Sequence, residues 1–460
     1  MPSPLPSTHR RALLRAAAAT GLGALAPLAG LSLAGAAKPG GPRLVLVILR
    51  GGLDGLSAVP TPGDPAFAEA RGALGRFASP LLPLDGLMAL HPALPGLHAL
   101  YGQRELLVVH ATGLPYRDRS HFDAQQVLES GGAMPFALDT GWLGRALAVS
   151  GHKGLALQTA VPLVLRGHAD VDTWAPSNRP DPAPDLVARL ERLYASDPPL
   201  AAALLRAREL RLDGALPGLA SGLPPPPASM GATGPSVATS PATSPATSPG
   251  HSAGSMPGPL ASAAPAMAAP GDAAALPTAP ARPLVLTLAR QAALFMAQPD
   301  GPQAAVLSLG GWDTHANQAG QGNDTGPLAG NLRTLDAALA ALREGLTSPA
   351  AGDTWRRTVV LVVTEFGRTV AINGTQGTDH GTGGAALVLG GAVQGGRVIA
   401  DWPGLAPQQR NDGRDLRITT DVRALFKSVL TDHLGIASAR VSQQVLPGTA
   451  QLAPLPILRG

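Results

Sequence analysis

Three apolar runs constrain the fold of this chain more than any other feature. Residues 44–49 (LVLVIL), 304–309 (AAVLSL) and 358–364 (TVVLVVT) are almost uninterrupted apolar stretches, two of them rich in valine. Strands that are apolar on both faces are typical of a parallel sheet covered by helices on both sides. Stretches with helical character separate the runs. The sequence therefore predicts an α/β fold with a mostly parallel central sheet and helices on both faces.

The other elements follow the same alternation, and the composition suits a large buried core. The chain has 460 residues, of which 45% are hydrophobic and 14% charged, which is typical of a globular protein. Strands are expected at residues 44–49, 106–110, 155–159, 304–309, 358–364 and 385–389. Helices are expected at residues 92–103, 120–130, 185–213 with a possible break at Pro198-Pro199, 283–297, 330–346 and 421–434.

The N-terminal segment has the pattern of an export signal. Adjacent Arg10 and Arg11 precede a weakly apolar run that ends in small residues at Ala36. This pattern predicts a twin-arginine signal peptide over residues 1–36, with the twin-arginine export machinery as a partner and a periplasmic or secreted location. An uncleaved membrane anchor is the alternative, since residues 16–37 carry no charge. The high Gly and Ala content favours cleavage, and hence no stable anchor.

Charge and cysteine usage narrow the partners. Three arginines in the N-terminal segment contribute to the formal charge of +4, so the remainder carries 4 − 3 = +1. A nearly neutral chain has little electrostatic attraction to phosphate backbones, and no nucleic-acid partner is expected. The chain contains no Cys, which is compatible with an oxidising compartment.

A low-complexity segment interrupts the chain. Residues 214–271 contain no Asp, Glu, Lys or Arg, and residues 238–249 repeat the unit ATSP three times. This composition predicts a disordered insertion at about 214–280. Candidate site residues lie on both sides of it, so residues 37–460 are expected to form one domain. Within it, residues 250–254 (GHSAG) match the nucleophile elbow of serine hydrolases, but no strand can precede them, which makes chance the better explanation.

Potential metal ligands lie next to the predicted strands. Because ligands bind at the carboxyl ends of strands in such sheets, these side chains are expected to share one edge. A loop that folds back over the edge would bring in the two that precede residues 385–389. Such a set suits a divalent metal, where imidazole favours Zn and carboxylate favours Mg, Mn or Ca. The commoner role of a single Asp in a Gly-rich loop is a turn or a helix cap. The six candidates are Asp54, Asp313, His315, Glu365, Asp379 and His380.

A polar segment at the start of a predicted helix supplies the catalytic candidates. Ser120 is placed as the N-cap, with Asp123 as its capping-box partner. Alternatively, the helix start binds an anion that Ser120 or a metal-bound water attacks, while His121 ligates metal or transfers protons and Arg119 clamps an oxyanion. Arg368 is either another anion clamp or a partner of the Glu365 carboxylate.

Several motifs together carry a family resemblance. In order they are RGGLDGLS, RSHFDAQ, GWLGRAL, GGWDTHANQ, TEFGRT and GTDHGTGGAALVLGG, followed by GRVIADWPGL. The chain resembles the bacterial family called domain of unknown function 1501, over nearly all of the mature chain except the insertion. Members often carry twin-arginine signals and are grouped by fold with the sulfatase-like, alkaline-phosphatase superfamily.

That resemblance implies roles for particular residues. It implies a first-strand aspartate at Asp54, a nucleophile region at Ser120, an Asp/His pair at Asp313 and His315, and a late histidine at His380. The chain departs from the pattern where many members have an Asp-His pair, since it has Glu365-Phe366-Gly367 there. The lost imidazole argues against a two-zinc site. The chain also lacks the C/S-x-P-x-R motif of formylglycine sulfatases.

The resulting hypothesis is an exported metal-dependent hydrolase that acts on a phosphate, sulfate or phosphonate ester of a small molecule or polymer. The alternative is a non-catalytic envelope protein on the same scaffold that binds a partner or helps to assemble it. A carbohydrate-binding module fits less well, because only 3% of the residues are aromatic. Specificity is expected to arise from residues 161–185 and 402–414.

Overall fold

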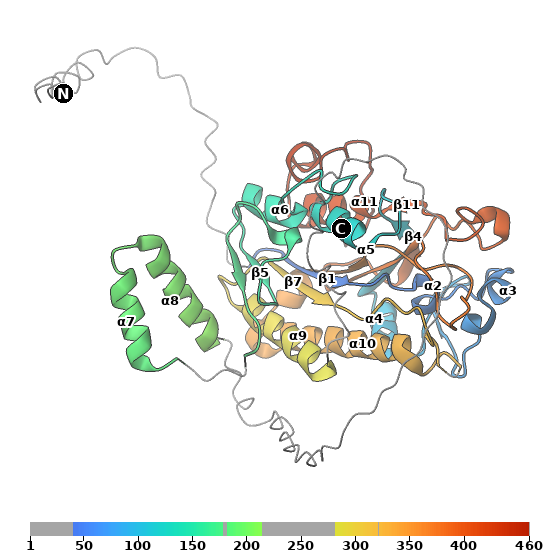
Figure 1. Ribbon diagram of the computed structural model, residues 1–460, viewed down its shortest axis with the longest axis horizontal. Coiled ribbons are helices and arrows are strands. Elements are labelled where there is room, and N and C mark those ends of the chain that lie inside the picture. The colour runs from blue at the N-terminus through green and yellow to red at the C-terminus, as the bar shows by residue number, and fades with distance from the viewer. Residues whose placement is uncertain (1–39, 178–181, 214–280, 321, 460) are drawn as a thin grey trace, which may run out of the picture.

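In the part of the chain that the structure describes, nine strands form one mixed sheet at the centre of the molecule (Figure 1). The computed structural model describes residues 40–177, 182–213, 281–320 and 322–459. The strand order is β10-β4-β9-β8-β1-β7-β5-β6, and β11 pairs with the end of β4. The strands are β1 (Arg43–Leu49), β4 (Leu106–Gly113), β5 (Gly154–Ala156), β6 (Val171–Thr173), β7 (Ala304–Leu309), β8 (Thr358–Thr364), β9 (Gly384–Leu389), β10 (Arg397–Ile399) and β11 (Thr420–Asp421), beside a small hairpin of β2 (Leu82–Pro83) and β3 (Ala89–Leu90).

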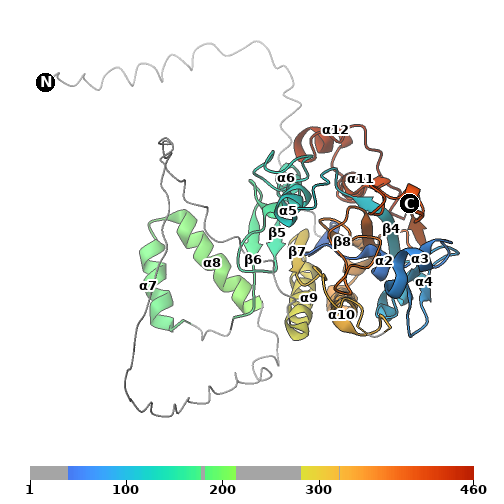
Figure 2. The same cartoon turned by 45° about the vertical axis from the view of Figure 1, so that its right-hand side comes forward.

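Helices cover both faces of this sheet, as Figures 1 and 2 show. Helices α4, α9 and α10 lie on one face, whereas α5, α6, α11 and α12 lie on the other. The α-helices are α2 (Gly55–Ala58), α3 (Phe67–Arg71), α4 (Pro95–Gly102), α5 (His121–Ser130), α6 (Trp142–Ser150), α7 (Pro184–Tyr194), α8 (Pro198–Asp213), α9 (Arg282–Ala297), α10 (Gly326–Leu346), α11 (Val422–Ser428) and α12 (Ser438–Arg440). Shorter 3₁₀ turns are η2 (Gly72–Gly75), η3 (Leu163–Leu165), η5 (Pro349–Ala351), η6 (Thr354–Arg357) and η7 (Pro407–Gln409), and π-helical turns are η8 (Val429–His433) and η9 (Val441–Val445).

Strand β1 shows why its sequence is apolar throughout. Val45, Val47 and Leu49 belong to the core on the side of α9 and α10, whereas alternate residues such as Leu46 and Ile48 belong to the core on the opposite side. Every residue of β1 is buried. The predicted α/β fold, with a mostly parallel sheet and helices on both faces, is confirmed.

The register of the central strands places several loops at one edge. Strand β1 lies between β7 and β8, with Leu49 level with Leu309 on one side and with Thr364 on the other. The carboxyl ends of these strands therefore meet, although residues 214–280 separate β1 from the other two in sequence. Strand β9 runs antiparallel to both β4 and β8, so its start lies at the same edge. That orientation brings the loop before β9 back over the carboxyl ends.

Local predictions succeeded best for buried strands. Strands β7 and β8 have the expected boundaries, and the break at Pro198-Pro199 separates α7 from α8. The expected helix over residues 421–434 was too regular, because α11 ends at Ser428 and a π-helical turn follows. The strand expected at 155–159 is shorter, ending at Ala156.

Helices α7 and α8 lie side by side beyond the β6 edge of the sheet (Figures 1 and 2), where Arg206 of α8 binds Asp172 of β6 at 2.6 Å. Among the described residues, no helix combines the length and apolar character needed to span a membrane. The predicted signal peptide (1–36), the predicted insertion (about 214–280) and the GHSAG segment lie outside the described residues.

Candidate metal centre

Three imidazoles and one carboxylate converge at the carboxyl edge of the sheet. His121 is the first residue of α5, Asp313 and His315 lie on the loop after β7, and His380 lies on the loop before β9. The Nε2 atom of His380 lies 2.9 Å from that of His121 and 3.0 Å from that of His315. The Oδ1 atom of Asp313 lies 3.4, 2.9 and 3.2 Å from the Nε2 atoms of His121, His315 and His380. We call these four side chains the metal cluster.

The opposite nitrogen of each imidazole contacts an oxygen acceptor. Nδ1 of His121 lies 2.8 Å from Oε1 of Glu365, and Nδ1 of His315 lies 3.2 Å from Oδ1 of Asp379. Nδ1 of His380 lies 3.0 Å from the carbonyl oxygen of Arg119. These oxygens can only accept, so each Nδ1 carries the proton. In the neutral rings, all three Nε2 lone pairs then point into the cluster.

This arrangement fits a bound cation. Lone pairs about 3 Å apart repel one another unless a proton or a metal ion lies between them. A tetrahedral zinc with bonds of about 2.0–2.1 Å would separate its ligand atoms by about 3.3 Å, close to the spacings among His121, Asp313 and His380, whose ligand atoms all lie within 4.8 Å of one another. Ligating histidines characteristically donate their second N–H to a carboxylate or a carbonyl, as all three do here. Three imidazoles and one carboxylate favour zinc or a similar transition metal over Mg or Ca.

Glu365 lies behind the cluster and holds His121 in place. Its Oε1 atom accepts hydrogen bonds from the Gly51 N–H (2.8 Å), the Gln125 amide (3.0 Å) and His121, and Oε2 accepts from the Thr364 hydroxyl (3.1 Å). Burial alone would raise the pKa of the Glu365 carboxyl, but the hydrogen bonds from His121 and Gln125 outweigh it and lower that pKa. The structure therefore makes Glu365, proposed from sequence as a ligand, a partner of a ligand.

Asp313 is held by a buried arginine. Arg368 donates from Nη1 to Asp313 Oδ1 at 2.6 Å, and from Nε to the Thr378 hydroxyl at 3.2 Å. Burial raises the pKa of the Asp313 carboxyl, but hydrogen bonds from two histidines and from Arg368 hold that pKa far below its usual range. Arg368 thus partners Asp313, not Glu365 as one alternative had it. It is 2% exposed, so it does not extend into solvent as an anion clamp.

The cluster is buried on one side and open on the other. The His121 side chain is only 6% exposed, whereas that of His315 is 42% exposed. Burial lowers the pKa of His121, but hydrogen bonds to Asp313 and Glu365 overcome it and raise that pKa to about 9. In the absence of a cation, a proton on His121 therefore satisfies the converging lone pairs. Solvent reaches the cluster on the His315 side.

Two further predicted ligands have other partners. Asp54 caps α2 through the N–H groups of Leu56 and Ser57, and its Oδ2 atom accepts from Arg71 (2.5 Å) and Gln318 (2.6 Å). Both carboxylate oxygens of Asp54 are therefore bound by donors outside the metal cluster. The pKa of Asp54, which burial would raise, is lowered by Arg71 and these hydrogen bonds.

Asp379 also lies outside the ligand set. Its carboxylate accepts hydrogen bonds from His315 and, at 3.1 Å, from the Asn373 amide.

The helix-start residues divide between capping and anchoring. The Ser120 hydroxyl caps α5 by accepting the Asp123 N–H at 3.5 Å, and in the described part of the chain no contact joins it to the metal cluster. The Asp123 carboxylate accepts from the Tyr116 hydroxyl at 2.9 Å instead of closing a capping box. The Arg119 guanidinium binds Asp415 at 2.6 Å, while its carbonyl faces His380. It is therefore not placed as an oxyanion clamp.

The sequence did not single out the residues that hold the cluster side chains in position. Gln125 supports Glu365 and is itself held by Arg50 at 2.8 Å. Gly51 donates its N–H to Glu365 at a φ of +121°, and a Cβ there would lie 2.5 Å from the Asp313 nitrogen. The only sequence signals were a Gly-Gly pair and a Gln one turn after His121. Such signals are too common to single out a partner.

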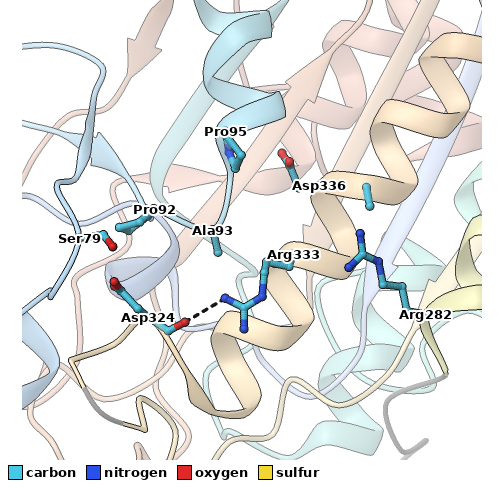
Figure 3. Close-up of a pocket in the computed structure, with 9 residues that line it drawn as sticks. Ser79, Pro92, Ala93, Pro95, Arg282, Asp324, Arg333 and Asp336 are labelled. Atoms are coloured by element: carbon cyan, nitrogen blue, oxygen red, sulfur yellow. Dashed lines mark hydrogen bonds between the residues drawn. The ribbon is translucent and has the colours of Figure 1, made fainter.

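A separate cavity lies between α4 and α10, away from the cluster. It has a volume of about 420 Å³, and Arg282, Arg333, Asp324 and Asp336 are among its lining residues (Figure 3). Asp336 caps α4 through the N–H groups of Gly96 and Leu97. Two carboxylates balance the two guanidinium groups, so the cavity carries no net charge that would select an anion.

Comparison with known proteins finds a family match in the C-terminal part of the chain. Residues 261–446 match the family described as "Protein of unknown function (DUF1501)". The family resemblance is thereby confirmed over this stretch, which includes Asp313, His315 and His380. No curated protein matches the chain in sequence.

Two solved structures are similar in part to this fold. One is described as "Crystal structure of Ps i-CgsB in complex with k-i-k-neocarrahexaose"; it is 10% identical with a TM-score of 0.39, and the match covers 90% of this chain and 75% of that one. The other is described as "Structure of BT1596, a 2-O GAG sulfatase"; it is 11% identical with a TM-score of 0.32, and the match covers 90% and 73%. Neither likeness bears on the chemistry of this site.

Proposed function

We propose that this chain is an exported, metal-dependent hydrolase that acts on a phosphate, sulfate or phosphonate ester. One divalent cation, with zinc favoured by the donors, is held by His121, His380 and Asp313, and His315 lies beside them on the exposed side. The observation that carries the proposal is the orientation of the three imidazoles. Each donates its Nδ1–H to an oxygen and directs its Nε2 toward the Oδ1 atom of Asp313. Ligating histidines characteristically have this orientation, with the second N–H donated to an oxygen.

A divalent ion supplies Lewis acidity toward an ester oxygen and activates water for attack. The side chains around the cluster orient its members. Glu365 and Arg368 hold His121 and Asp313 from the buried side, and exposed His315 leaves an approach for substrate. Ser120 has no contact with the metal cluster in the described residues, which supports water over Ser120 as the nucleophile. Export rests on the twin-arginine pattern of residues 1–36 alone.

Elemental analysis of the purified mature protein tests the metal directly. We expect about one zinc-like ion per chain, and a clear loss of metal in Asp313→Ala and His315→Ala. His98→Ala is a matched control, because His98 is half-buried and contacts the Pro83 carbonyl oxygen, outside the cluster. Hydrolysis of aryl phosphate, sulfate and phosphonate esters should fall with the metal. A metal-free wild type that hydrolyses none of these esters would refute the proposal.

A non-catalytic role on the same scaffold is the second candidate. It is favoured by two placements: the oxygens of Glu365 are occupied by other donors, and the guanidinium of Arg119 is held by Asp415. The centre thus has neither a second metal position at Glu365 nor a clamp at Arg119. Stoichiometric co-purification of one partner, unchanged by Asp313→Ala and His315→Ala, combined with no turnover, would select this function.

A further inference from the structure

We propose that Asp415 is a positioning residue for the metal centre, acting on His380 through the main chain of Arg119. The inference rests on the proposed metal site. It assigns a role to a loop, residues 411–416, that contributes no ligand. It also replaces the expected role of Arg119, whose contribution comes from its carbonyl oxygen and not from its charge on a substrate.

Asp415 holds the Arg119 side chain in an ion pair that is buried on the Asp415 side, whereas the Arg119 side chain is 27% exposed. Its Oδ2 atom accepts hydrogen bonds from Arg119 Nε at 2.9 Å and from Nη2 at 2.6 Å. The Asp415 side chain is 0% exposed. Two charge-assisted hydrogen bonds to one buried carboxylate oxygen restrict the guanidinium far more than an exposed pair would.

The loop that carries Asp415 is itself tied to the site. Asp415 and Asn411 exchange backbone hydrogen bonds of 2.8 and 3.0 Å. The Leu416 carbonyl accepts the Gly383 N–H at 3.0 Å, just before β9, and the Arg414 carbonyl accepts the Val370 N–H at 3.2 Å. Asp415 is therefore held rigidly with respect to the chain on both sides of His380.

Arg119 has an unusual backbone conformation. Its φ is +60°, a left-handed value that costs a residue with a side chain about 1–2 kcal/mol. In this conformation its carbonyl oxygen accepts the Nδ1–H of His380 at 3.0 Å. The next residue caps α5, and His121 follows. The conformation of Arg119 thus bears on two ligands, one through a hydrogen bond and one through chain connectivity.

Loss of the Asp415–Arg119 ion pair should break the hydrogen bond between His380 and the Arg119 carbonyl oxygen. Without Asp415, Arg119 can relax to a negative φ, which removes the carbonyl oxygen from His380. Either ring nitrogen of His380 can then carry the proton, and the Nε2 lone pair is no longer held toward the cluster. Partners behind a ligating histidine are typically worth 10–100-fold in metal affinity, so we expect a decrease of about 10-fold.

The comparison of Asp415→Asn with Asp412→Asn tests the proposal. Asp412 contacts the same Arg119 Nη2 atom at 3.3 Å, but its side chain is 73% exposed. Two properties are measured on the full mature protein. The first is the ¹⁵N shift pattern of His380 in metal-free protein at alkaline pH, assigned with His380→Gln. The second is the dissociation constant for Co²⁺, with the visible spectrum of the complex.

We expect Asp415→Asn to lose the Nδ1–H pattern of His380 and to bind Co²⁺ about 10-fold more weakly. Asp412→Asn should change neither property. Retention of both properties in Asp415→Asn, or equal effects in the two variants, would overturn the proposal. If the wild type binds no Co²⁺, the proposed function fails, while the ¹⁵N pattern still decides whether Asp415 positions His380.

If Asp415→Asn does not fold, a milder variant still tests the proposal. Arg119→Lys keeps a positive charge on Asp415 but loses the paired N–H geometry. It should shift the His380 pattern and the Co²⁺ affinity in the same direction by a smaller factor. An unchanged pattern in Arg119→Lys, with unchanged affinity, would count against the proposal.

Discussion

Metal binding to this protein should compete with a single proton. The pKa of His121 is raised to about 9, because hydrogen bonds to Asp313 and Glu365 outweigh burial. Below that pH the metal-free cluster holds a proton on His121, and the incoming cation must displace it. Above that pH the nitrogen is already free. The apparent affinity for zinc should therefore rise with pH up to about 9 and level off beyond it.

The expected size follows from the difference between the working pH and this pKa. Each pH unit below 9 costs a factor of ten in apparent affinity, or about 1.4 kcal/mol, when one proton is displaced. Between pH 9 and pH 7 the dissociation constant should rise about 100-fold. Glu365→Gln removes one of the carboxylates that raise the pKa of His121. The zinc affinity of this variant should therefore level off at a lower pH and change less between pH 7 and pH 9.

Competition with a chelator of known zinc affinity measures the effect. The dissociation constant is determined from pH 6.5 to above pH 9, and the protons released are counted by calorimetry in buffers of different ionisation enthalpy. About one proton per zinc is expected near neutral pH. An affinity that does not change with pH across this window, after correction for the chelator, would refute this account of His121.

Three predictions concern stability, each measured by urea unfolding. Arg71→Met leaves Asp54 buried without its cation and should cost about 3–5 kcal/mol, more than the double variant with Asp54→Asn; equal costs would contradict this. Gly367→Ala places a Cβ 1.8 Å from a backbone carbonyl oxygen and should cost about 2 kcal/mol or more, whereas Gly374→Ala, with nothing within 4 Å, should stay within about 0.5 kcal/mol. Burial lowers the pKa of His110 to about 4, below its unfolded value near 6.5, so the unfolded chain takes up a proton first as the pH falls. Between pH 6.5 and pH 4 the free energy of unfolding of the wild type should fall by about 3 kcal/mol more than that of His110→Gln. Parallel pH profiles of the two proteins would contradict the lowered pKa of His110.

The candidate site combines residues whose place at the sheet edge the sequence indicated with different clarity. Asp313 and His315 follow a strand whose end the apolar pattern located, so their place at the sheet edge could be anticipated. His380 reached that edge only if its loop folded back, and the antiparallel direction of β9 provides this. His121 stood out only as one of several polar residues at a helix start. Its orientation toward the cluster depends on a hydrogen bond to Glu365, 244 residues away in sequence.

Two predicted ligands have other partners in the structure, and they show what a sequence pattern cannot specify. Asp54 and Glu365 each follow a strand as a metal ligand would, yet both carboxylates are occupied by other donors. Arg71 neutralises Asp54 from a short helix nearby, whereas Gln318 reaches it across 264 residues. A strand pattern specifies that a carboxylate lies at the edge, but not which donors surround it there.

The sequence by itself determined the main buried strands, the class of fold and the edge of the sheet at which the candidate residues lie. These follow from hydrophobic periodicity and turn residues, which act over about ten neighbouring positions. Only the tertiary structure decided which side chains face one another. The strand order, the reversed direction of β9 and the loop that carries Asp415 bring together groups far apart in sequence, such as Gly51 and Glu365, which are 314 residues apart. Ligand and supporting residue are distinguished by a few ångströms and by hydrogen-bond direction, which depend on long-range packing and are not encoded in local patterns.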